Sequence, residues 1–115
     1  MKAEISAPSL VGLGDELAAG RAYQGLGIAS SRVEILRFVL SRSEVSTADV
    51  MREFCITRNG ARNHLESLSA QNLVTVRHAT HPRGSGPIRY WRANPPEVAL
   101  LLDLFADYVF SAASP

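Results

Sequence analysis

Two arginines and two asparagines stand close together near the middle of the 115-residue chain, as Arg58, Asn59, Arg62 and Asn63. Arginine can donate a pair of hydrogen bonds to O6 and N7 of guanine, and asparagine can pair in the same bidentate way with N6 and N7 of adenine. In a helix, residues four apart lie on the same side. The spacing therefore predicts a set of side chains that reads base edges in the major groove of double-stranded DNA.

A helix that starts next to Thr57 would present these side chains. The Thr57 hydroxyl can cap it by accepting a hydrogen bond from a backbone amide that has no partner within the helix. Its buried face is predicted at Ala61, Leu65 and Leu68, whose spacing of four and three is helical. Gly60 costs such a helix about 1 kcal/mol relative to alanine. Either close approach to DNA requires this glycine or the helix tolerates it.

A shorter helix and a tight turn are predicted directly before it. The shorter helix starts at Ser46 or Thr47, with the negative charge of Asp49 in its first turn. The turn falls at Cys55-Ile56, where Cys55 is interpreted as a small buried residue. The residues expected to point inward are Val50, Met51 and Phe54. The two helices and the turn together form a helix-turn-helix.

Another helix is predicted to precede this motif. It begins at Ser30 or Ser31, and Glu34 follows Ser31 at the spacing of a capping box. Its apolar stripe has helical period and consists of Val33, Leu36, Val39 and Leu40, widened by Ile35 and Phe38.

A β-hairpin is predicted after the motif. Asn72 can adopt the left-handed conformation that ends a helix, and the alternating segments 73–77 and 88–92 have strand character. The ten residues between them are rich in glycine and proline, so the hairpin has a long tip. Beside a helix-turn-helix such a hairpin is a wing, whose residues Arg83, Ser85 and Arg89 are candidate contacts to DNA phosphate or the minor groove.

Two further wing features have competing interpretations. His78 and His81 could bind a metal, but two histidines on such a loop are interpreted as surface residues or neighbours of phosphate. Tyr90 and Trp91 could form an aromatic platform for a ligand. Because adjacent strand residues face opposite sides, we expect one ring in the core and the other partly exposed.

The last 21 residues predict a long apolar helix. Asn94, two prolines and Glu97 make a strong helix start. One broad apolar face follows, and it predicts a dimerisation surface formed by Val98, Leu101, Leu102, Phe105, Tyr108 and Val109, with Leu100 and Leu104 at its edge.

Charge is distributed unevenly. Residues 30–94 hold ten arginines and five acids, a net charge of +5, while residues 1–29 and 95–115 carry −1 and −3. A basic middle favours contact with a polyanion. The single cysteine excludes an intrachain disulfide and suits a reducing cytoplasm. No apolar run is long enough for a membrane span or forms a signal peptide, and no catalytic motif is present, so we expect a cytoplasmic protein that is not an enzyme.

The predicted organisation has three parts. Residues 1–29 contain repeated glycines and form an N-terminal arm or a short helix over residues 15–23. Residues 30–94 form a winged helix-turn-helix domain that binds DNA, and residues 95–115 form a C-terminal dimerisation helix. The expected fold class is mainly α with a small antiparallel β-hairpin, and no cofactor or metal is expected.

The stretch from Leu26 to about Leu104 resembles the ArsR-type winged helix-turn-helix repressors. The resemblance is carried by SSRVEILRFVL, STADVMREF, ITRNGARNHLESLSAQNLV and VRH…RYWRANP. His64-Leu65-x-x-Leu68 followed by Asn72-Leu73-Val74 matches the family's His-Leu…Leu…Gly-Leu-Val segment, with Asn72 in place of glycine. Gly60 stands where relatives usually carry serine or threonine, which removes one expected phosphate contact.

The resemblance implies a symmetric homodimer that represses transcription by binding a palindromic operator. Metal-sensing members carry Cys-x-Cys in the first motif helix, whereas this chain has Cys55 alone, so a metal site is not carried over. The residues expected to contact DNA are Thr57, Arg58, Asn59, Arg62, Asn63, His64, Arg83, Ser85 and Arg89. Two alternatives stay open at this stage, namely a winged-helix protein-interaction adaptor and a thiol- or metal-responsive sensor that uses Cys55.

Overall fold

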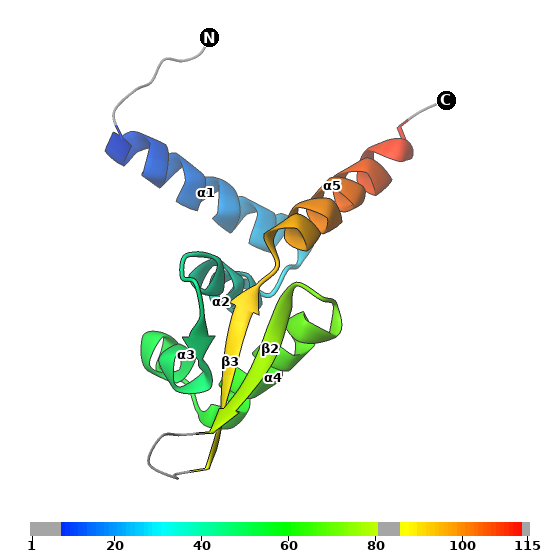
Figure 1. Ribbon diagram of the computed structural model, residues 1–115. Coiled ribbons are helices and arrows are strands. Elements are labelled where there is room, and N and C mark those ends of the chain that lie inside the picture. The colour runs from blue at the N-terminus through cyan, green and yellow to red at the C-terminus, as the bar shows by residue number, and fades with distance from the viewer. Residues whose placement is uncertain (1–7, 81–85, 114–115) are drawn as a thin grey trace. The chain divides into compact units, whose positions relative to one another are not determined.

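The computed structural model describes residues 8–80 and 86–113, and their side chains from residue 14 onward (Figure 1). The chain divides into two compact units, residues 1–31 and 32–115. Its elements in order are α1 (Pro8–Leu26), α2 (Ser30–Leu40), β1 (Val45–Ser46), α3 (Thr47–Phe54), α4 (Arg58–Ala70), β2 (Val74–Thr80), β3 (Pro87–Ala93) and α5 (Pro95–Ser111).

The N-terminal unit contains α1, which is longer than the helix that the sequence predicts over residues 15–23. It ends because Gly27 adopts a left-handed φ of 67°, and the Ile28 amide then donates to the Tyr23 carbonyl at 3.0 Å. Leu17 and Leu26 of this helix are exposed. None of the helices that the structure describes is long and apolar enough to cross a membrane.

The core of the second unit lies between α2, α3, α4 and the sheet. On α2 the fully buried residues are Ile35 and Val39, whereas Leu40 is exposed. Leu36 and Phe38 pack against the core as the predicted stripe requires, so the prediction was wrong at Leu40. The helix begins at Ser30, one of the two predicted starts, so Ser31 lies in its first turn.

The sequence predicts the start of α3 well. Ser46 Oγ accepts a hydrogen bond from the Asp49 amide at 3.1 Å, and the Asp49 carboxylate accepts one from the Ser46 amide at 2.9 Å. This reciprocal pair is a capping box. Val50 is fully buried, and the Phe54 ring meets Phe38 of α2 edge to face, with centroids 5.8 Å apart.

The turn after α3 depends on a left-handed residue. Cys55 has φ 54° and ψ 47°, and the Ile56 amide donates to the Met51 carbonyl at 3.2 Å. A non-glycine residue in this region is uncommon and costs about 1–2 kcal/mol. Cys55 itself is exposed, so the prediction of a buried cysteine was wrong. The turn must bend the backbone there, and that bend leaves the short side chain in solvent.

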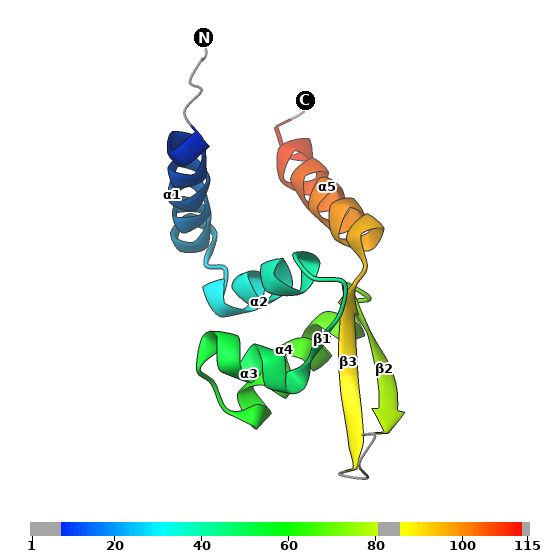
Figure 2. The ribbon, with the colours of Figure 1, turned by 60° about the vertical axis from the view of Figure 1, so that its left-hand side comes forward.

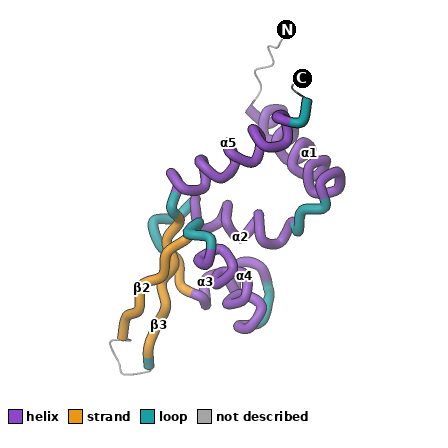
Figure 3. The backbone as a smooth tube through the Cα atoms, turned by 90° about the vertical axis from the view of Figure 1, so that its right-hand side faces the viewer, coloured by secondary structure: helices purple, strands orange, loops and turns teal. Residues whose placement is uncertain are grey.

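The sheet has three antiparallel strands in the order β1-β3-β2, with Val45 paired to Trp91 and Val76 also paired to Trp91 (Figure 2). The hairpin of β2 and β3 matches the prediction, while the two-residue β1 was not predicted. Val74 is fully buried as expected, but Val76 on the same side is 37% exposed. From Val76 onward, β2 and β3 therefore extend away from the core toward the wing tip (Figure 3).

Trp91 is the largest fully buried side chain. Its indole Nε1 donates to Thr47 Oγ1 at 2.9 Å, so the only polar atom of the ring is satisfied. Thr47 is buried as well. This bond ties the first residue of α3 to the middle strand of the sheet. The prediction of one core and one partly exposed ring is confirmed, since Tyr90 is half-buried.

The start of α5 is joined to the end of α4. Asn72 takes a left-handed φ of 63°, and the amides of Asn72 and Leu73 donate back to Ser69 and Leu68. Asn94 stands at the N-cap of α5, at the predicted helix start, but its side chain makes no capping hydrogen bond. Its Nδ2 donates to the Asn72 carbonyl at 3.1 Å, and its amide donates to the Leu73 carbonyl at 2.9 Å.

These elements form a winged helix-turn-helix, mainly helical with a small antiparallel sheet and followed by a C-terminal helix. The predicted fold class is confirmed.

Candidate nucleic-acid interface

The beginning of α4 is held by its predicted cap. Thr57 has an extended backbone and its Oγ1 accepts a hydrogen bond from the Gly60 amide at 3.0 Å. The buried face is the predicted one, because Ala61, Leu65 and Leu68 are at most 4% exposed. Burial of that face fixes the rotation of α4. The opposite side of its first two turns therefore faces outward.

The four candidate base-reading residues share that outward side. Arg58, Asn59 and Asn63 are exposed and Arg62 is half-buried. Arg62 Nη2 donates to Asn59 Oδ1 at 3.0 Å, a contact between residues three apart on the helix. Because this partner is neutral, the positive charge of Arg62 is not cancelled. The pair presents one cationic, donor-rich edge.

Gly60 lies between the cap and this edge. A Cβ placed on it would be 3.3 Å from Thr57 Oγ1 and 3.9 Å from Ile56 Cβ. The first distance is tighter than ordinary van der Waals contact, so a side chain here would press on the capping hydroxyl. The absence of a side chain thus leaves room for the capping hydroxyl, a role that the sequence analysis did not consider.

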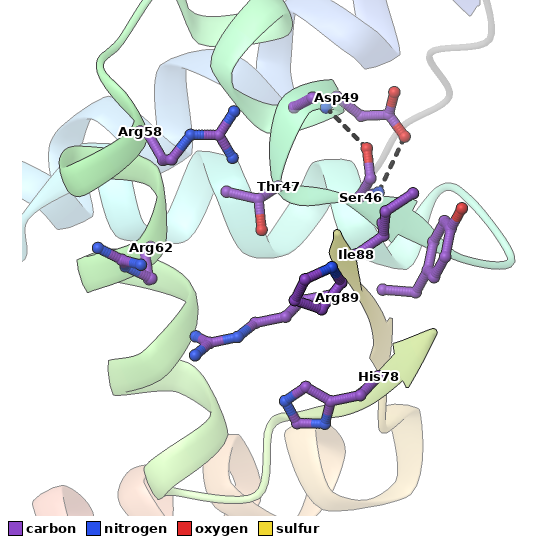
Figure 4. Close-up of a pocket in the computed structure, with 11 residues that line it drawn as sticks. Ser46, Thr47, Asp49, Arg58, Arg62, His78, Ile88 and Arg89 are labelled. Carbon is purple, nitrogen blue, oxygen red and sulfur yellow. Dashed lines mark hydrogen bonds between the residues drawn. The ribbon is translucent and has the colours of Figure 1, made fainter. Parts of the chain in front are cut away.

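A groove of about 750 Å³ separates the start of α4 from the wing (Figure 4). Its basic side chains come from three elements, with Arg58 and Arg62 on α4, His78 on β2 and Arg89 on β3. Asp49 is the carboxylate that lines it, and that group is already bonded to the Ser46 amide and to Arg52. The groove is therefore electropositive and suits a phosphodiester backbone.

Sequence reasoning did not place His78 in this groove. The signal existed in the strand register, because His78 pairs with Arg89 across the hairpin and paired residues share one face of a sheet. That register could not be derived without knowing the length of the wing loop.

Arg89, a predicted contact to DNA, already forms an ion pair within its own chain. Its Nη1 lies 2.9 Å from Glu66 Oε2 on α4, and the two side chains are 38% and 52% exposed. An ion pair this exposed contributes about 0–1 kcal/mol of stability. Glu66 was not singled out in the sequence.

A second arginine braces the root of the wing on the other face of the sheet. Arg77 donates from Nε and Nη2 to the two carboxylate oxygens of Glu44, at 3.0 and 2.9 Å. Its guanidinium also lies 4.6 Å from the centroid of the Tyr90 ring. Arg77 holds the pKa of Glu44 below its ordinary value of 4.5, chiefly through these hydrogen bonds.

His64 links α4 to α2. Arg32 Nε donates to His64 Nδ1 at 3.2 Å. Arginine can only donate, so Nδ1 is the unprotonated nitrogen and Nε2 carries the hydrogen. Partial burial, and secondarily the charge of Arg32, lower the pKa of His64 from its ordinary value of 6.5. Through the hydrogen on Nε2, His64 can donate to a phosphate.

Several predicted residues lie outside the described residues or are placed differently. His81, Arg83 and Ser85 belong to the segment 81–85 that the structure does not describe. Val98 is buried against its own chain, so the exposed face of α5 begins after it, contrary to its inclusion in the dimer surface. Within residues 8–80 and 86–113, no three His, Cys, Asp or Glu side chains gather as a metal site would require.

The rest of the predicted dimer surface is exposed. Leu101, Leu102, Phe105, Tyr108 and Val109 are between 46% and 77% exposed, and the same helix also exposes Leu100, Leu104 and Phe110. Few soluble monomers leave a contiguous apolar area of this kind in water.

Solved structures share this fold. A possible transcriptional regulator from Methanosarcina mazei superposes with a TM-score of 0.60 at 8% identity, covering 84% of this chain and 85% of that one. A double mutant of Lactococcus lactis ZitR in its apo form gives a TM-score of 0.53 at 15% identity, covering 96% of this chain and 78% of that one. The Multiple Antibiotic Resistance Repressor, MarR, gives 0.53 at 11% identity, covering 94% and 84%. No family model and no curated protein matches the sequence.

Proposed function

We propose that this chain is a dimeric transcriptional regulator that binds double-stranded DNA. The observation that carries the proposal is the groove between α4 and the wing, where three arginines and a histidine from separate elements meet around one neutralised carboxylate. A solvated helix face would not need a matching basic side chain on a strand across from it. The fold, which is that of transcriptional regulators, supports the same reading.

In this proposal α4 enters the major groove with its first two turns. Arg58 and Arg62 would pair with guanine or phosphate, and Asn59 and Asn63 with adenine. Thr57 and His64 flank this edge and would donate to the backbone. The wing would lie along the adjacent backbone, with Arg89 reaching a phosphate and Arg83 and Ser85 proposed for the tip.

Dimerisation is proposed through α5. By helical geometry Leu102, Phe105 and Val109 share one side with Leu101 and Tyr108. Asp103 and Asp107 lie on the opposite side, and α5 carries no base. A twofold axis along the apolar side would bury that surface. It would also place two α4 helices in successive major grooves about 34 Å apart, so the operator would be palindromic.

We further propose that this regulator is a repressor and that it acts in the cytoplasm. This part of the proposal rests on the ArsR-type resemblance of residues 26–104 and on the likeness to MarR, which is named as a repressor. Repression needs no further feature of the DNA-binding site, because a dimer bound at a promoter represses by occupying it.

Selection of bound sequences from random duplex DNA tests the proposal. We expect an enriched palindrome with half-sites one helical turn apart, and an affinity that falls steeply as salt increases. A chain that binds no duplex at low ionic strength would instead be a protein-interaction module. Enrichment of a single half-site would instead indicate that the chain binds DNA as a monomer.

A further inference from the structure

We infer that Glu66 competes with DNA phosphate for Arg89, so that this carboxylate weakens DNA binding until a phosphate replaces it. The inference rests on the proposed function and concerns how the same surface is controlled. It starts from the contact that leaves a predicted DNA-binding arginine already paired within its own chain.

Arg89 stands at the border between two hollows. It lines the large groove with Arg58 and Arg62, and it also lines a smaller hollow of about 360 Å³ on the side of α4 where Glu66 lies. In Figure 4 its side chain extends from β3 toward α4. The Arg89 guanidinium is thus within reach of a strand in the groove and is held at its edge by Glu66.

The ion pair between Arg89 and Glu66 can be exchanged for another partner. A single distance of 2.9 Å joins the two side chains, and both are substantially exposed. The brace on the other face of the sheet is different, because Arg77 makes two hydrogen bonds to Glu44 and also covers the Tyr90 ring. The wing therefore contains one doubly bonded pair that holds its root and one singly bonded pair that faces the groove.

A DNA backbone is a suitable competitor for the groove-facing pair. A phosphate accepts guanidinium hydrogen bonds as a carboxylate does. Arg58 and Arg62, which have no acidic partner among the described contacts, would hold the strand beside Arg89. Because Glu66 and the phosphate compete for the same guanidinium, removing the charge of Glu66 should tighten binding.

The test is a double-mutant cycle of Glu66→Gln and Arg89→Ala, measured by fluorescence anisotropy with a labelled duplex over a range of salt concentrations. We expect Glu66→Gln to bind about two- to fivefold more tightly than the wild type, as loss of one exposed ion pair allows. This gain should vanish in the presence of Arg89→Ala. Arg89→Ala alone should reduce the slope of log affinity against log salt by about 0.9, the value for one phosphate contact.

Two controls separate this mechanism from general charge effects. Glu44→Gln removes the same charge from the wing root and should leave binding unchanged or weaken it, because Arg77 braces rather than binds. Glu53→Gln removes a charge from the exposed side of α3 and should change affinity by less than Glu66→Gln. Thermal melting of each variant confirms that the fold persists.

An unchanged or weaker affinity of Glu66→Gln overturns the inference, and so does a gain that survives Arg89→Ala. Neither result affects the proposed function, which stands or falls on whether the wild-type chain binds duplex DNA at all.

Discussion

The helices α4 and α5 differ in how much of their apolar faces is buried. On α4 the apolar residues Ala61, Leu65 and Leu68 are buried within one chain, and polar residues cover the rest of the helix. On α5 only Val98 is buried, and eight large apolar side chains after it are exposed. The apolar face of α4 is covered by its own domain, whereas most of the apolar face of α5 is left exposed.

The contrast separates two kinds of constraint on the sequence. The apolar residues of α4 stabilise the fold and so orient the polar edge that would meet DNA. Those of α5 contribute little to the fold after Val98, yet exposing them costs solubility. The proposed dimer would account for their presence, and the two helices should respond differently to substitution.

The largest effect is expected from Leu65→Ala on α4. Leu65 is fully buried, so truncation should lower the free energy of unfolding by about 2–5 kcal/mol through lost burial and the cavity left behind. Denaturant titration measures this change. The matched variant Leu101→Ala on α5 removes an exposed leucine and should leave the free energy of unfolding of the monomer nearly unchanged. Equal losses in the two variants would erase the contrast.

The next effect is expected from Phe105→Glu on α5. A charge in the centre of the proposed dimer surface should weaken association by at least about 2 kcal/mol, or about 30-fold. Sedimentation should then show monomers whose circular dichroism is still that of the folded domain. Asp107→Asn, on the acidic side, is the control and should remain a dimer. A dimer that survives Phe105→Glu would place the interface on another surface.

On the polar edge of α4, Arg62→Ala should remove about 1–3 kcal/mol of discrimination at one base position. Binding to the selected palindrome should weaken while the preference at the other positions persists. Competition assays with single-base variants of the site measure this. Arg21→Ala removes an arginine that lies outside the winged domain, and it should leave the same preferences intact.

A smaller effect is expected where α4 ends. Asn72 has a positive φ, so Asn72→Ala should lower the free energy of unfolding by about 1 kcal/mol, because a Cβ without a local polar group disfavours that conformation. Asn72→Gly adopts it freely and should keep or slightly raise the stability. Both variants retain the carbonyl that Asn94 binds, so the joint to α5 is unaffected. A loss of stability in both variants would mean that the side-chain amide of Asn72, rather than its φ, contributes to stability.

The smallest effect concerns pH and the link from α4 to α2. The pKa of His64 is lowered in the folded state, so neither the folded nor the unfolded state carries this proton well above pH 6.5. As pH falls below 6.5, the unfolded chain binds a proton first and the folded state loses relative stability. His64→Gln should flatten this decline between about pH 7 and 5. The lowered pKa of Glu44 acts at lower pH, so the two contributions can be separated.

Local signals carried much of the fold. Thr57 caps α4 as its type and position predict, and α3 begins where Ser46 and Asp49 indicate, although the hydrogen bonds between those two residues were not predicted. The buried positions of α4 were also predicted, because a narrow apolar stripe allows a single rotation. On α2 the stripe was broad, with Ile35 and Leu40 equally apolar, and only the neighbouring elements decide which of them is buried.

Contacts between distant residues could not be predicted. The strand β1 has two residues and exists because β3 pairs with it. Glu66 and Arg89 are 23 residues apart and meet through the angle between α4 and the wing. The candidate base-reading residues were predicted from their types, but the groove that surrounds them depends on the register of a hairpin whose loop the sequence does not fix.

The bond between Trp91 and Thr47 has a consequence for how the chain acquires its fold during synthesis. It spans 44 positions, and Trp91 fills the centre of the core late in the sequence. When a ribosome has made α2, α3 and α4, their apolar faces have no sheet to cover them, and the largest core side chain has not yet left the exit tunnel. The winged domain therefore closes only after β3 and Val98 emerge, and contacts of such long range slow folding. Until then the nascent chain exposes an unfinished core.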